Sequence, residues 1–72
     1  MYMLEAKKLS VNAKPSIIAR GDLMTMTALF TPTVMSGEYL RVVLYEPDGW
    51  EIVNEYDLRG VLEGFASERG DA

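Results

Sequence analysis

The most informative stretch of this chain runs from residue 38 to residue 66 and reads EYLRVVLYEPDGWEIVNEYDLRGVLEGFA. Its first nine residues alternate side chains in the period-two pattern of a strand that is buried on one face. Leu40, Val42 and Leu44 share the face that we expect to form the core. The opposite face is predicted to be an open sheet face, and it carries Tyr39, Arg41, Val43 and Tyr45.

A tight turn is predicted directly after this strand. Pro47 fixes φ for the first corner, Asp48 tolerates the second, and Gly49 accepts the positive φ that completes a type I turn with a bulge. We therefore expect a hairpin whose second strand returns through residues 50–53.

A helix is predicted after the hairpin. Asn54 has the side chain of a helix N-cap, and Glu55 and Asp57 would lie near the positive end of the helix dipole. Apolar side chains then follow at the i, i+3, i+4, i+7 and i+8 spacing of a single helix face. These side chains are Leu58, Val61, Leu62, Phe65 and Ala66.

The first half of the chain favours strands. Residues 23–31 alternate Met and Phe with Thr and Leu, which predicts a central strand. Residues 17–20 precede it, and the Gly21-Asp22 pair between them fits either a two-residue hairpin or a bulged bend within one long strand. Residues 2–11 are interpreted as a further strand, with a short helix around residues 4–9 as the alternative.

These elements together predict an α+β fold. We expect a three- to four-stranded antiparallel sheet, built as a meander or from hairpins, with one C-terminal α-helix packed on one face. No repeat, low-complexity tract or linker divides the chain, so residues 1–72 are predicted to form a single small domain. A sheet covered by one helix leaves its other face open, and a largely apolar open face needs a partner.

Charge is distributed unevenly along the sequence. The net charge is −4, but residues 1–45 carry five basic and three acidic side chains, whereas residues 46–72 carry two basic and eight acidic ones. Such a negative region attracts a basic protein surface and repels nucleic acid and anionic membranes. The alternative is that it only keeps the protein soluble. The predicted partner-binding acidic surface consists of Glu46, Asp48, Glu51, Glu55, Asp57 and Glu63.

The composition argues against catalysis. The chain has no histidine and no cysteine, which removes the common catalytic triads and zinc sites. We therefore predict no catalytic residues, no cofactor and no metal site. The longest uncharged run, residues 23–37, is too short and too polar to span a membrane, and a cytoplasmic protein is expected.

Two hypotheses of function follow. In the first, the chain is a non-enzymatic protein-binding module, of the kind that phages and other mobile elements encode as small acidic inhibitors. It would occupy a basic surface of a larger protein machine that handles nucleic acid. In the alternative, it is a structural or assembly subunit that forms a homodimer through the open sheet face, with Tyr39, Arg41, Val43 and Tyr45 at the contact.

Overall fold

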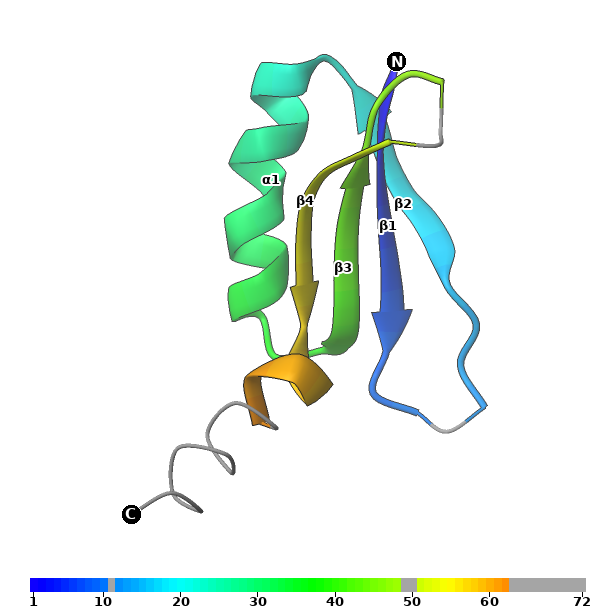
Figure 1. Ribbon diagram of the computed structural model, residues 1–72, viewed down its shortest axis with the longest axis vertical. Coiled ribbons are helices and arrows are strands. Elements are labelled where there is room, and N and C mark those ends of the chain that lie inside the picture. The colour runs from blue at the N-terminus through cyan, green and yellow to red at the C-terminus, as the bar shows by residue number, and fades with distance from the viewer. Residues whose placement is uncertain (11, 49–50, 63–72) are drawn as a thin grey trace.

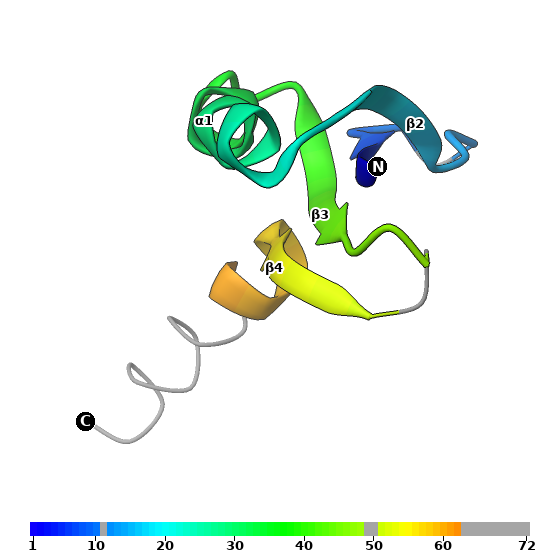
Figure 2. The ribbon, with the colours of Figure 1, turned by 90° about the horizontal axis from the view of Figure 1, so that it is seen from above.

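The computed structural model describes residues 1–10, 12–48 and 51–62. Four strands and one long helix follow each other in the order β1 (Tyr2–Lys8), β2 (Ser16–Gly21), α1 (Leu23–Met35), β3 (Tyr39–Tyr45) and β4 (Ile52–Asp57). The strands form one antiparallel sheet in the order β2-β1-β3-β4. Helix α1 lies against one face of this sheet (Figures 1 and 2). The predicted α+β class and the four-stranded antiparallel sheet are confirmed.

The N-terminal strand β1 lies in the middle of the sheet, between β2 and β3, so the predicted meander is wrong. The preference for a strand over a helix in this part of the chain is confirmed. Because β2 and β3 each run antiparallel to β1, they run parallel to each other. Parallel strands need a long crossover connection, which is usually a helix. The topology therefore requires a helix where the sequence pattern predicted a strand.

The predicted strand at residues 23–31 is wrong, because this segment lies within α1. Asp22 is the N-cap of the helix: its side chain accepts a hydrogen bond from the backbone N–H of Thr25 at 2.7 Å. The predicted two-residue hairpin at Gly21-Asp22 is therefore also wrong. Met26, Phe30 and Val34, at the i, i+4, i+8 spacing, are the helix side chains that pack in the core.

The hairpin of β3 and β4 is confirmed, but the second strand is longer than predicted. Asn54 lies within β4 and is not a helix N-cap. Residues 58–62 are helical after the strand ends, and the Asp57 Oδ1 atom accepts a hydrogen bond from the backbone N–H of Arg59 at 2.9 Å. The predicted C-terminal helix is thus confirmed only in part. Its last predicted core residues, Phe65 and Ala66, lie outside the described residues.

The hydrophobic core fills the space between the sheet and α1. Side chains from β1 and β3 meet those of the helix there, and the buried members of this cluster are Leu4, Ala6, Met26, Phe30, Val42 and Leu44. The helix that covers the core is therefore α1, in the middle of the chain. Val61 and Leu62, from the predicted C-terminal helix, are exposed.

Each of the three strand pairs contains one irregularity in register. Between β1 and β3, Lys7 pairs with Arg41 and Lys8 pairs with Tyr39, so Leu40 is an extra residue, as in a β-bulge. Because a bulge shifts the alternation of side chains by one position, Tyr39 packs against the core and Leu40 lies elsewhere. The predicted faces of these two residues are therefore wrong, whereas Val42 and Leu44 face the core as expected.

Candidate functional site

Three carboxylates gather where β3 turns into β4. Glu46, Asp48 and Glu51 each place a carboxylate oxygen within 4.8 Å of the other two, and we call this group the acidic turn. The backbone N–H of Glu46 donates to the carbonyl of Glu51 at 2.9 Å, which closes the connection. Asp48 and Glu51 are exposed and Glu46 is half-buried. Half of the six predicted acidic residues are thus brought together at one point of the surface.

The acidic turn concentrates negative charge enough to perturb one of its members. The pKa of Glu46 is raised, first by a side-chain hydrogen bond to Glu51 and next by the negative charge of that group. Because folding raises the pKa of the Glu46 carboxyl, protonation of this group stabilises the folded state at a pH below the ordinary glutamate pKa. This stabilisation is lost as the pH rises through the raised pKa. At neutral pH the three carboxylates repel each other, and a cationic partner would relieve this repulsion.

The other predicted acidic residues lie apart from the acidic turn. Glu55 accepts from the guanidinium of Arg41, with Nη2 at 2.8 Å and Nε at 3.2 Å from the same Oε1 atom. This hydrogen bond raises the pKa of Arg41, so the guanidinium stays charged beside Glu55. Asp57 accepts a backbone hydrogen bond at the end of β4. Glu63 lies outside the described residues.

The predicted self-association surface is only partly assembled. Arg41, Val43 and Tyr45 lie on the sheet face away from α1, and Tyr39 lies on the helix side, where it packs against the core. Val43 is buried, with only 1% of its surface exposed, although it does not belong to the core cluster. Its direct cross-strand neighbours are Glu5 and Glu55.

Polar side chains cover the sheet face that points away from α1. The Tyr45 hydroxyl, on β3, donates to the Glu5 carboxylate, on β1, at 3.4 Å. On the other side of Val43, the Arg41–Glu55 ion pair joins β3 to β4. Burial, followed by the charge of Glu5, raises the pKa of Tyr45. The face is therefore less apolar than its sequence suggested, because the chain's own charged groups cover its valine.

Helix α1 has an uncharged outer surface, which the strand prediction did not anticipate. None of its 13 residues is charged, and Met24 and Met35 are exposed over 84% and 78% of their surface. Outward-facing helix positions usually carry charged or polar groups. The signal that could have revealed this helix is Asp22, an N-cap residue that precedes Met26 and Phe30 at i, i+4 spacing.

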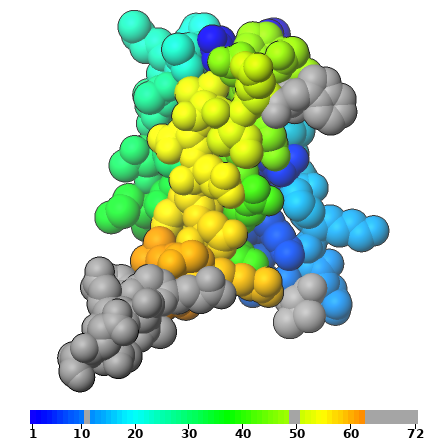
Figure 3. Space-filling model, viewed as in Figure 1, coloured from blue at the N-terminus to red at the C-terminus, as the bar shows by residue number. Residues whose placement is uncertain are grey.

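The sheet edges are also exposed. Strand β4 crosses the front of the molecule in Figure 3, and most of its side chains are exposed. Its pairing with β3 leaves Val53 as an extra residue, and the pairing of β2 with β1 leaves Ile18 as one. Bulges at sheet edges disfavour the addition of a strand from another chain.

Comparison with known proteins yields no relative: no family model matches the chain, and no significant match was found among curated proteins or solved structures. In the described part of the chain, no helix is long and apolar enough to cross a membrane. The case for function therefore depends on the surfaces of the molecule itself.

Proposed function

We propose that this protein is a non-enzymatic binding module that docks on a basic surface of another protein through its acidic turn. The observation that carries the proposal is the approach of three carboxylates to within 4.8 Å at the tip of a hairpin. Asp48 and Glu51 are exposed, so this group of carboxylates is open to a partner. Negative charge concentrated there speeds association with a cationic surface and orients it.

The partner that fits best is a protein that handles nucleic acid. Such proteins carry clusters of lysine and arginine that contact phosphates, and a compact group of carboxylates competes for the same cations. The chain would then act as an inhibitor, by covering a basic surface that otherwise binds nucleic acid. An origin in a phage or another mobile element remains part of this hypothesis.

Reversal of one charge in the acidic turn provides the test. Proteins retained by the immobilised chain from a native lysate are purified, and each is titrated with the original protein and with Glu51→Lys. We expect Glu51→Lys to weaken binding about tenfold or more, because it puts a cation among the carboxylates facing a cationic surface. The measured affinity should also fall as salt is added, since screening weakens such contacts.

Glu38→Lys is the matched control. It makes the same change in net charge at another exposed acidic residue, outside the acidic turn. The proposal requires Glu38→Lys to bind nearly as well as the original protein. Unchanged binding by Glu51→Lys, or an equal loss in both variants, would show that the acidic turn is not the contact.

Self-association through the open sheet face, the alternative function, has less support. Tyr39 lies on the other side of the sheet, and Val43 is already covered. Arg41 is engaged in its ion pair with Glu55. Only part of the predicted contact surface is thus available to a second copy.

A further inference from the structure

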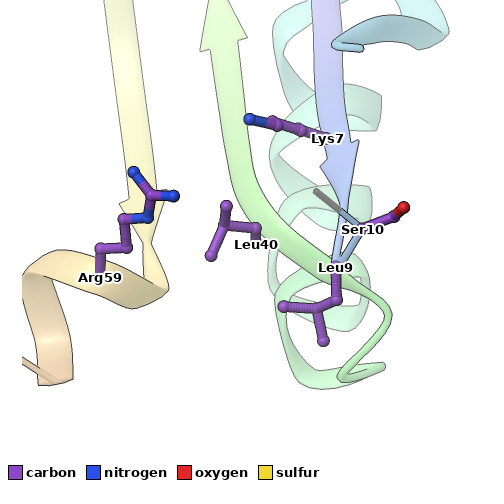
Figure 4. A pocket seen from close by; sticks show the side chains of 5 residues that line it. All are labelled: Lys7, Leu9, Ser10, Leu40 and Arg59. Atoms are coloured by element: carbon purple, nitrogen blue, oxygen red, sulfur yellow. The ribbon is translucent and has the colours of Figure 1, made fainter. Parts of the chain in front are cut away.

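A hollow of about 240 Å³ lies at the opposite end of β3 from the acidic turn. We call it the cationic hollow, and its lining residues are Lys7, Leu9, Ser10, Leu40 and Arg59. Figure 4 shows the side chains of Lys7 and Arg59 pointing toward each other across the space above Leu40. Within the described part of the chain, no acidic side chain lines this hollow.

Three features of the fold build the cationic hollow. The bulge in β3 moves Leu40 away from the core, so that its side chain lies in the hollow. Asp57 anchors the first turn of residues 58–62, which carries Arg59. The backbone N–H of Leu9 donates to the carbonyl of Glu38 at 3.2 Å, which holds the end of β1 against the start of β3.

The two cations of the hollow have no counter-charge among residues 1–10, 12–48 and 51–62. Among the described residues, neither Lys7 nor Arg59 forms an ion pair through its side chain. Of the carboxylates nearby, Glu55 is paired with Arg41, whereas Asp57 accepts from the backbone N–H of Arg59 and forms no ion pair with the Arg59 side chain. Two like charges that converge on one space repel each other, and an anion placed between them removes that repulsion.

We propose that the cationic hollow binds an oxyanion group, a phosphate or a carboxylate, carried on a short apolar stem. The planar guanidinium of Arg59 can donate two parallel hydrogen bonds to such a group, and Lys7 adds a point charge from the other side. The Ser10 hydroxyl is a further donor at the rim. Leu9 and Leu40 supply the apolar wall that a stem of a few carbons would contact.

The hollow is an open depression in which one anionic group and a short chain can contact the lining residues. Its volume of about 240 Å³ is below the roughly 300–1,000 Å³ of sites for drug-sized molecules and cofactors. This proposal is independent of the acidic turn, which lies at the other end of β3. Its success or failure therefore does not affect the proposed protein-binding function.

Titrations followed by backbone amide chemical shifts test the site. The probes are butyl phosphate, butyrate, inorganic phosphate and 1-butanol, added to the full chain at low ionic strength. We expect butyl phosphate or butyrate to give saturable shifts at Ser10, Leu40 and Arg59, and the tighter of the two identifies the anionic group. Inorganic phosphate should bind the same site more weakly, because it lacks the stem. Equal shifts with 1-butanol, or no saturation with either butyl compound, would overturn the proposal.

Two double variants separate the site from a general effect of charge. Lys7→Gln with Arg59→Gln should weaken binding about tenfold or more, because each substitution removes a charged hydrogen-bond donor. Lys14→Gln with Arg20→Gln removes the same charge from two exposed residues outside the hollow and should leave binding nearly unchanged. If both double variants weaken binding equally, the chain attracts anions only through its overall field, and the hollow is not a site.

Discussion

Asp22 shows how one side chain establishes an element of this fold. Its carboxylate accepts the backbone N–H of Thr25, which has no partner within the helix. That hydrogen bond is the main cause of the lowered pKa of Asp22. A carboxyl whose pKa is lowered by folding stabilises the folded state above its unfolded pKa, and the stabilisation is lost as the pH falls through the folded pKa.

We predict that Asp22→Ala lowers the melting temperature at neutral pH by roughly 4–8 °C, the usual effect of losing an N-cap in a domain of this size. The deficit should shrink as the pH falls below about 4, the ordinary aspartate pKa, and through the lower pKa that Asp22 has in the folded state. Thermal unfolding followed by circular dichroism across this pH range measures both effects. Asp22→Asn is the control, because it keeps an acceptor oxygen and should retain most of the stability. A pH-independent deficit in Asp22→Ala would contradict the assigned role of the charge.

The alternation of side chains in residues 39–45 predicted the strand correctly but not every face. Val42 and Leu44 lie in the core as expected, whereas Tyr39 and Leu40 exchange sides at the bulge. A bulge depends on the register with β1, which is a long-range property. No local pattern in the sequence reports it. The residues of the cationic hollow were missed for the same reason.

At the scale of elements, residues 23–35 satisfy two periodicities at once. Met24, Met26 and Phe30 fall on one face of a strand, whereas the inner face of the helix contains Met26 and Phe30 but not Met24. Threonines raise the strand propensity and bias the local interpretation. The crossover between the parallel strands β2 and β3 resolves the ambiguity in favour of the helix, and this requirement emerges only from the complete topology.

Two methionine substitutions distinguish the two periodicities. Met26 is 2% exposed and Met24 is 84% exposed, although both would be buried on one face of a strand. We predict that Met26→Ala lowers the free energy of unfolding by about 2–5 kcal/mol, whereas Met24→Ala changes it by less than about 0.5 kcal/mol. Urea unfolding followed by tryptophan fluorescence or circular dichroism measures both. Similar losses in the two variants would contradict the helix.

The C-terminal helix was misplaced for a related reason. The predicted N-cap is Asn54, but aspartate is an equally good N-cap residue, and Asp57 follows three positions later. Pairing with β3 extends β4 through Asp57, since Arg41 and Val42 continue to find partners there. Sheet pairing thus selected the later cap.

At the scale of the whole molecule, charge is separated along β3. The acidic turn follows the C-terminal end of this strand, and the cationic hollow includes Leu40, near its start. The uneven distribution of charge was visible in the sequence. Its division into an acidic turn and an Arg41–Glu55 pair was not, because that division depends on which strand neighbours β3.

The polar side chains that cover the open sheet face, and the bulges in the edge strands β2 and β4, lead to a prediction about assembly. We expect the purified protein to have the mass of one chain in light scattering at micromolar concentration. Tyr45→Ser should leave this mass unchanged, because Tyr45 already has a hydrogen-bond partner within the chain. A dimeric mass that Tyr45→Ser reduces to that of one chain would instead support self-association through the sheet face.

The central place of β1 has a consequence for the order of folding. The hairpin with β2 closes over a short separation, but the pairing of β1 with β3 joins Met3 to Tyr45 across the whole of β2 and α1. Closing so long a loop costs chain entropy before any contact compensates for it, and non-local contacts of this kind slow folding. During synthesis, one side of β1 has no neighbour until β3 has been made. We therefore expect the meeting of β1 and β3, and not the formation of either hairpin, to limit the folding rate.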